Sequence, residues 1–274
     1  MKIATQNRRK ANISERPRHK GAVLGMAVGL GGVLALGGLG WLGRWATESS
    51  AFALKQVSVT GNERATVTEL ARMSGVSLGE NLLQLDVEQA EAGVGAHPWV
   101  ASVSVTRRFP NRLTISVVEH KPVAWVALGE LYLVNSQGRP FKKATAKEDF
   151  NLPVLTGIDR AQFIGNAAGG ADRILHALAV MEAYNHLPEA KRAPLSEVRL
   201  MREGLVLVVG DGEEIRLGTD DAIERLSKLS LVREGLMRQG LSSRVIHLDN
   251  RVRPDWVTVQ LAAPHSERRG PKAY

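Results

Sequence analysis

The sequence HPWVASVSVTRRFPNRLTISVVEHKPVA, residues 97–124, contains two runs, 100–107 and 112–119, in which apolar and polar residues alternate. A period of two places the apolar side chains on one face of a β-strand. The residues Phe109-Pro110-Asn111 between the runs are typical of a turn. The stretch therefore predicts a β-hairpin, with its apolar face turned toward a core.

The residues before this hairpin predict one more strand and two short helices. Residues 55–60 alternate and stop at Gly61-Asn62, as a strand and turn would. Thr66 and Glu69 fit a capping box for a helix that stops at Gly75, and Asp86 is a suitable N-cap for a second helix to about residue 93. The expected order is strand, helix, helix, strand, strand, with both helices covering one face of a three-stranded sheet.

Further upstream, residues 21–43 form an uncharged apolar stretch that is rich in glycine. A helix of this length spans roughly 34 Å, enough for a hydrocarbon core of ~30 Å. Residues 1–20 hold seven Lys and Arg and one Glu, so the positive-inside rule places them in the cytoplasm and the remainder of the chain outside it. We expect an uncleaved transmembrane anchor rather than a signal peptide, since 23 residues exceed the usual apolar region.

The residues after the hairpin predict a second, mostly antiparallel β-sheet domain with two helices. The fold class is therefore α+β, with a single transmembrane helix in front. Strands are expected at 124–128, 131–134, 198–201, 205–209, 213–217, 244–248 and 256–261, and helices at 172–186 and from Thr219 to about 239.

Composition and motifs argue against several classes of function. The chain has 274 residues and no cysteine, which excludes disulfides, thiolate metal sites and a cysteine nucleophile. The net charge of +8 lies in the two termini, so the neutral body between them does not suggest nucleic-acid binding. None of the common metal, hydrolase or nucleotide motifs occurs. We expect no catalytic residues, no cofactor, no metal and no small-molecule substrate.

The order of these elements resembles a POTRA domain, and residues 98–124 are similar to the POTRA of the FtsQ/DivIB family of bacterial cell-division proteins. Three further segments, YLVNSQGRPF (132–141), LPVLTG (152–157) and IHLDNR (246–251), resemble motifs of that family's second domain. The resemblance implies a cytoplasmic basic tail (1–20), a transmembrane helix (21–43), a POTRA domain (52–121), an FtsQ-type β domain (122–263) and a C-terminal tail (264–274).

The resemblance also implies a function based on binding. It implies a non-enzymatic divisome scaffold in the bacterial inner membrane, enriched at the septum, with a cytoplasmic N-terminus and a periplasmic C-terminal region. Such a scaffold contacts other divisome membrane proteins, links early and late division proteins, and binds the FtsB–FtsL complex by adding a strand to a sheet edge. The implied partner-binding residues are Arg251, Trp256, Val257, Thr258, Val259 and Gln260.

Two points about this edge remain open at the level of sequence. Trp256 is either an exposed anchor for a partner or a core residue of the last strand. Where the family often has an aromatic residue after the arginine, this chain has Val252, followed by the turn-forming Arg253-Pro254-Asp255. The register of an added strand is therefore open.

Two alternative functions belong to other classes. A membrane-anchored exported enzyme acting on peptidoglycan would require a deep polar cleft with perturbed carboxylates. A POTRA-bearing export or outer-membrane assembly factor would require repeated POTRA units or a barrel of strands of about ten residues. The sequence contains a single POTRA-like unit and no pattern of barrel strands.

Overall fold

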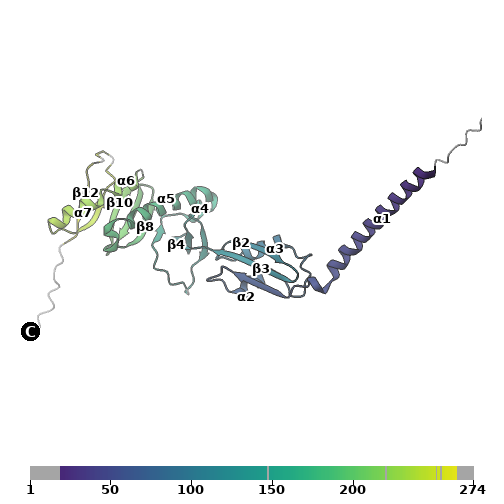
Figure 1. Ribbon diagram of the computed structural model, residues 1–274. Helices are drawn as coiled ribbons and strands as arrows, with labels where there is room; N and C mark the ends of the chain where they lie inside the picture. Colours follow the sequence, from purple (N-terminus) through teal and green to yellow (C-terminus); the bar gives the residue numbers. More distant parts are fainter. Residues whose placement is uncertain (1–18, 147, 220, 251, 254, 264–274) are drawn as a thin grey trace, which may run out of the picture.

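The computed structural model describes residues 19–146, 148–219, 221–250, 252–253 and 255–263. These residues form a long helix, then a small module built on a three-stranded sheet, then a large unit built on a nine-stranded sheet (Figure 1). We call residues 52–119 the small module and residues 122–261 the large unit. The predicted tails, 1–20 and 264–274, lie almost wholly outside the described residues.

The first helix, α1 (His19–Glu48), contains the apolar stretch 21–43 for which the sequence predicts a helix. Within the part of the chain that the structure describes, no helix combines the length and hydropathy of a membrane span. Several side chains of the predicted anchor lie outside the described residues. The anchor stays a prediction from the sequence.

The small module has the predicted order of elements. A short 3-10 turn, η1 (Ser50–Phe52), leads into β1 (Gln56–Thr60), α2 (Val67–Met73), α3 (Val87–Gly95), β2 (Val100–Arg108) and β3 (Arg112–Glu119). The sheet order is β1-β3-β2, with β1 parallel and β2 antiparallel to the central β3. The hairpin and the strand beside it are confirmed.

Both helices of the small module begin at the predicted caps. The Thr66 side chain accepts a hydrogen bond from the Glu69 backbone, and the Glu69 carboxylate accepts one in return from the Thr66 backbone. The Asp86 carboxylate likewise caps α3. Such caps satisfy backbone N–H groups that the first turn of a helix leaves without partners.

A turn at Gly61 closes the small module. Its φ of +82° suits glycine, and a Cβ there would meet the Val117 carbonyl oxygen at 2.1 Å. The turn brings the backbone N–H groups of residues 63–65 onto the carboxylate of Glu119, which accepts from all three. The last residue of β3 thus anchors the loop that leads into α2.

The large unit contains more short elements than the sequence predicts. Its strands are β4 (Pro122–Ala127), β5 (Leu131–Asn135), β6 (Pro140–Lys143), β7 (Val154–Thr156), β8 (Leu195–Met201), β9 (Gly204–Val209), β10 (Glu213–Gly218), β11 (Ser243–His247) and β12 (Thr258–Leu261). They form one sheet in the order β12-β11-β10-β9-β8-β7-β4-β5-β6. The pairs β4–β7, β7–β8 and β10–β11 are parallel and the others antiparallel, so the sheet is mixed, although antiparallel pairs predominate.

The expectation of two helices in this unit is wrong. The described residues contain α4 (Arg160–Gly165), α5 (Ala167–Asn185), α6 (Ala222–Leu226) and α7 (Leu229–Arg238), with a 3-10 turn η2 (Pro188–Lys191). Instead of one helix starting at Thr219, the chain first turns at Asp221, whose φ is +52°, and α6 ends before Ser227. The left-handed backbone of Asp221 is incompatible with a continuous helix at that residue, so α6 begins only at Ala222.

One face of the large sheet packs against α5, α6 and α7. Apolar residues from strands across the sheet form a continuous buried core with α5 residues such as Ile174 and Tyr184. The strand residues include Leu155, Val198, Leu207, Ile215 and Ile246. Burial of this surface is the main force that holds the helices on the sheet.

The other face of the sheet continues the core of the small module at its β4–β5 end. Trp125 and Leu133 are buried together with Leu113 and Ile115 of β3 rather than with the helices of their own unit. Trp125 packs edge-on against Phe150, and its indole N–H donates to the Phe150 carbonyl at 3.2 Å. A hydrophobic core therefore crosses the junction between the two parts.

Aromatic rings and charges complete this junction. The ring of Trp99 lies 5.5 Å from that of Phe141, and the guanidinium of Arg64 lies 4.5 Å from the ring of Phe150. Lys142 forms an ion pair with Glu148 at 2.6 Å, although the Glu148 side chain is only 8% exposed. Burial disfavours the charge of Glu148, but hydrogen bonds from Lys142 and Thr145 outweigh it and lower the pKa of Glu148 to about 2.

Trp125→Ala is expected to destabilise both parts at once, by about 3–5 kcal/mol, because it opens a cavity in a core that both parts share. Guanidinium unfolding of the full chain in detergent, followed by circular dichroism, would measure the loss. Trp256→Ala is the control, since that ring is 60% exposed and its removal should cost less than about 0.5 kcal/mol. Separate unfolding of the two parts in the wild type would contradict a shared core.

Candidate functional site

The last strand, β12, forms one edge of the large sheet. It pairs antiparallel with β11, with Val259 opposite Ile246 and Gln260 opposite Val245. Among the described residues, no strand pairs with its other side. In Figure 1, β12 lies at the end of the molecule farthest from α1.

The structure places five of the six predicted partner-binding residues along this edge, while Arg251 lies outside the described residues. Thr258 and Gln260 are exposed, whereas Val257 and Val259 are half-buried and pack on the core beneath the sheet. This alternation is that of a strand with one face on a core. Trp256 and Val257 were predicted to lie in the strand, but they precede it.

Trp256 ends a turn instead of starting a strand, because its backbone N–H donates to the Arg253 carbonyl at 2.9 Å. The Asn250 side chain accepts hydrogen bonds from the backbone of Val252 and Arg253 and so shapes the preceding loop. The Arg253 guanidinium lies 4.3 Å from the Trp256 ring, which remains 60% exposed. The interpretation of Trp256 as a core residue is therefore wrong.

The hydrogen bonds of β12 show which backbone groups face outward. The N–H of Ala262 donates to the Ser242 carbonyl at 2.8 Å, on the β11 side. Backbone groups alternate in direction along an antiparallel strand, so the N–H of Gln260 also points toward β11. The N–H groups of Val259 and Leu261 then point away from the sheet, where another strand could accept them.

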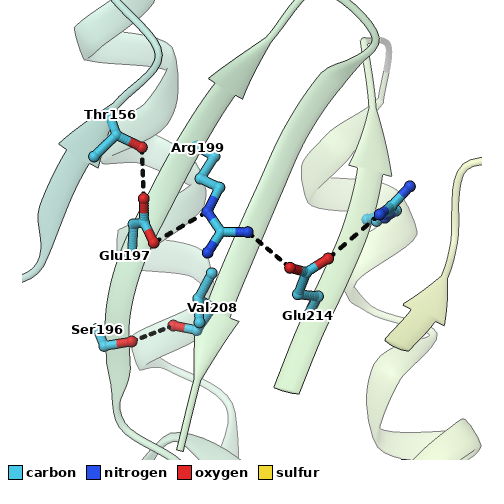
Figure 2. A network of polar contacts seen from close by, with 7 residues as sticks. Thr156, Ser196, Glu197, Arg199, Val208 and Glu214 are labelled. Atoms are coloured by element: carbon cyan, nitrogen blue, oxygen red, sulfur yellow. Dashed lines mark hydrogen bonds and ion pairs between the residues drawn. The ribbon is translucent and has the colours of Figure 1, made fainter. Parts of the chain in front are cut away.

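A ladder of charged side chains crosses the sheet on the face opposite the helices, and the sequence analysis did not predict it. Arg199 on β8 bonds Glu197 at 3.0 Å and reaches across β9 to Glu214 on β10 at 2.7 Å. Figure 2 shows these contacts, with Thr156 of β7 donating to Glu197 at one end. Arg216 extends the ladder from Glu214 at 3.4 Å.

This ladder covers an apolar strip and keeps that face of the sheet charged. Val206, Val208 and Val245 lie on the same face and are buried, although they belong to neither core. The stems of long charged side chains can cover such residues while the charged ends stay in water. Hydrogen bonds from Arg199, opposed by burial and supported by Arg216, lower the pKa of Glu214.

The pairing of β10, β11 and β12 places residues of the ladder in line with exposed side chains of β12. Glu214 lies beside Val245, which lies beside Gln260 of β12, while Arg216 lies beside His247 and then Thr258. Paired residues of neighbouring strands share one face of a sheet. The exposed side chains of β12 therefore continue the charged face, and a strand added at this edge would adjoin it.

A second sheet edge, on β2 of the small module, is partly blocked by a side chain. The carboxylate of Glu91 on α3 accepts a hydrogen bond of 2.7 Å from the backbone N–H of Val105 on the outer side of β2. An edge donor that is already bonded cannot pair with an incoming strand. This difference favours β12 over β2 as a site for strand addition.

Within the described residues, no group of three or more histidine or acidic side chains is arranged to hold a metal ion. The β12 edge and the sheet face beside it have the features of a binding surface, namely open backbone donors, the exposed Trp256 and an ordered charged ladder.

Two protein-family models match the chain. The model described as "POTRA domain, FtsQ-type" matches residues 52–120, and that described as "Cell division protein FtsQ/DivIB, C-terminal" matches residues 123–249. The second match stops before Arg251 and β12. The placement of the edge residues therefore comes from the structure rather than from that match.

Several curated proteins are similar over most of their length. A protein named Cell division protein FtsQ from Myxococcus fulvus is 44% identical over 248 residues, which cover 90% of this chain and 87% of the relative. A protein of the same name from Anaeromyxobacter sp. (strain K) is 37% identical over 271 residues, which cover 96% of this chain and 92% of the relative. Another of that name, from Syntrophotalea carbinolica, is 28% identical over 236 residues, which cover 82% of this chain and 83% of the relative. The resemblance inferred from the sequence is confirmed.

Arg199→Met is expected to destabilise the protein by about 1 kcal/mol at neutral pH, since it removes the charge and keeps an apolar stem over the valines. A carboxylate with a lowered folded-state pKa stabilises the fold above its unfolded pKa, and that gain is lost as pH falls through the folded value. The difference between wild type and variant should therefore shrink as the pH falls below about 4.

Urea unfolding at a series of pH values would measure this change. Arg202→Met is the control, because Arg202 is an exposed arginine that takes part in none of the ion pairs of the ladder. A difference between wild type and Arg199→Met that stays constant with pH would contradict a role of the ladder in holding Glu214 ionised.

Proposed function

Because the chain belongs to the FtsQ/DivIB family of cell division proteins, we propose that it is a membrane-anchored scaffold of the divisome that binds partners through the β12 edge. Members of this family are non-enzymatic division proteins, and this chain is one of them. Membership also argues against both alternatives, a peptidoglycan enzyme and an export or assembly factor.

The proposed arrangement begins with an anchor in the inner membrane. Residues 21–43 would cross the membrane, the basic segment 1–20 would stay in the cytoplasm, and the small module and large unit would lie in the periplasm. The POTRA domain would occupy residues 52–121, the FtsQ-type β domain 122–263 and a tail 264–274. Enrichment at the septum and the link between early and late division proteins belong to the same proposal.

The proposed partner of the edge is the FtsB–FtsL complex, which would add a strand to β12. The observation that carries this proposal is the open outer side of β12, where the N–H groups of Val259 and Leu261 face away from β11. Backbone pairing would supply affinity that depends little on side-chain identity. Contacts with Trp256, Arg251 and the exposed side chains of Thr258 and Gln260 would supply specificity.

The position of the edge also favours partner binding. β12 lies at the far end of the molecule from α1, so a partner could reach it without contacting the junction between the two parts (Figure 1). The charged ladder beside it disfavours nonspecific association of two such sheets, because stacking would bury Arg199 and Glu214 away from water. Pairing at the edge avoids that cost.

Leu261→Pro is expected to weaken binding of purified FtsB–FtsL at least tenfold, because proline removes an outward N–H that the added strand would use. Leu261→Ala is the matched control, since it shortens the same half-exposed side chain and keeps the N–H. Proline is tolerated on edge strands when its missing donor faces outward, so both variants should fold. Circular dichroism checks the fold and a pull-down or calorimetry measures binding.

If Leu261→Pro and Leu261→Ala bind equally well, strand addition at β12 is contradicted. If Leu261→Pro and Leu261→Ala bind equally well but Trp256→Ala does not bind, the partner would contact side chains at the β12 edge without pairing with its backbone. No binding by folded wild type at high micromolar concentration would contradict the proposed partner itself.

A further inference from the structure

The end of the small module nearest α1 exposes large apolar side chains. Phe109 at the tip of the β2–β3 hairpin is 59% exposed, and Leu78 and Leu83, on the loop between α2 and α3, are 69% and 38% exposed. Large apolar side chains such as Ile164 and Leu231 are also exposed elsewhere, but these three lie on two segments at the end of the small module next to α1. We call the segments 78–83 and 108–112, together with Lys55, the proximal surface.

Hydrogen bonds bring these two segments to one place. The backbone of Leu54 bonds both Gly79 and Glu80, and the N–H of Lys55 donates to the Asn111 carbonyl at 2.9 Å. The ring of Phe52 packs edge-on against that of Phe109, with centroids 6.3 Å apart. The segment that enters β1 therefore holds the loop and the hairpin tip side by side.

The same end is attached to the last turn of α1. The Asn81 side chain donates to the carbonyl oxygens of Thr47 and Ala46, at 2.6 and 3.1 Å. These bonds satisfy carbonyl groups that the end of a helix leaves free. They fix the proximal surface beside the point where α1 ends (Figure 1).

The length of α1 places this point at the level of lipid headgroups. If residues 21–43 cross the hydrocarbon, α1 continues five residues further to Glu48, a rise of about 7.5 Å. The headgroup layer on one side of a bilayer is about 5–8 Å thick. The small module then begins where the headgroups end, with Phe109 and Leu78 close to the membrane surface.

The charges of the proximal surface suit an anionic membrane. Lys55, Arg108 and Arg112 are exposed, and none of them forms an ion pair within the part of the chain that the structure describes. Glu80 is the acidic residue among the segments 78–83 and 108–112. Exposed apolar groups surrounded by cations are typical of surfaces that bind anionic lipid.

We propose that the proximal surface rests on the outer face of the membrane, with Phe109 and Leu78 entering the headgroup region and the three cations contacting anionic lipid. The inference rests on the proposed anchor, because α1 brings this surface to the membrane. Its consequence is orientation: contact at this end holds the small module upright and directs β12 away from the lipid.

Site-directed spin labelling of the full chain in nanodiscs containing phosphatidylglycerol tests this proposal. The chain has no cysteine, so single substitutions can be labelled without background. Leu78→Cys, at a position that is 69% exposed, reports on the proximal surface. Val118→Cys, at a position that is 61% exposed, is the control, about 20 Å along β3 from Arg112. Leu34→Cys reports on the anchor independently.

Accessibility to oxygen relative to a water-soluble nickel complex measures depth in the membrane. We expect this ratio to be several-fold higher at Leu34→Cys and Leu78→Cys than at Val118→Cys. The ratio at position 78 should fall toward that of position 118 when Arg108→Glu, Phe109→Ser and Arg112→Glu are combined with the label. It should also fall when phosphatidylglycerol is replaced by zwitterionic lipid.

The remaining outcomes overturn the proposal in distinguishable ways. A lipid-exposed label at 34 with a water-exposed label at 78 would overturn contact at the proximal surface and leave the anchor intact. A water-exposed label at 34 would overturn the anchor and the contact together. Lipid exposure at both 78 and 118 would mean that the module lies flat on the membrane, which contradicts the upright orientation.

Discussion

Trp125 is a residue of the large sheet that is buried in the core of the small module, and this placement constrains the rest of the molecule. Its indole ring lies on the face of the sheet away from the helices, where it contacts Phe150 and closes the apolar layer begun by Leu113 and Ile115. An indole of this size is stable in such a position only if both parts keep their relative orientation. The shared core therefore joins a three-stranded and a nine-stranded sheet into one body.

Because the small module covers one end of the large sheet, different parts of the sheet have different surroundings. Its β4–β5–β6 end is covered by the small module, its centre carries the charged ladder of Glu197, Arg199 and Glu214, and its other end is β12. The helices occupy the opposite face throughout. Of the sheet edges considered above, β2 has an outer donor engaged by Glu91, whereas the outer donors of β12 face away from the protein. The outward donors of β12 therefore lie at the end of the molecule farthest from α1.

The small module could be predicted from the sequence almost element by element, because its signals are local. Alternation in β2 and β3, the capping box at Thr66 and the N-cap at Asp86 each depend on residues within a few positions of one another. The large unit was predicted less completely. The strands β6 and β7 have only four and three residues, too few for a periodic pattern. The break between α6 and α7 falls at Ser227-Lys228, where the sequence has neither glycine nor proline to signal it. The family resemblance came from the order of motifs, which is more robust than any single boundary.

The candidate site illustrates the same limit. The sequence located the edge strand and its residues, but it left open whether Trp256 is buried, since that depends on the turn fixed by Arg253 and Asn250. The ladder was missed because its members come from β8 and β10 and meet across β9, a relation that only strand register creates. The junction was missed because the pattern of β4 does not reveal which core its tryptophan enters.

Residue-resolved amide hydrogen exchange of the full chain, with and without FtsB–FtsL, tests the central claim most directly. Strand addition predicts that the N–H groups of Val259 and Leu261 exchange quickly in the free protein and become strongly protected in the complex. The N–H of Gln260, already directed toward β11, serves as an internal reference with protection in both states. If the partner binds but leaves the exchange of Val259 and Leu261 unchanged, the open side of β12 is not the binding site.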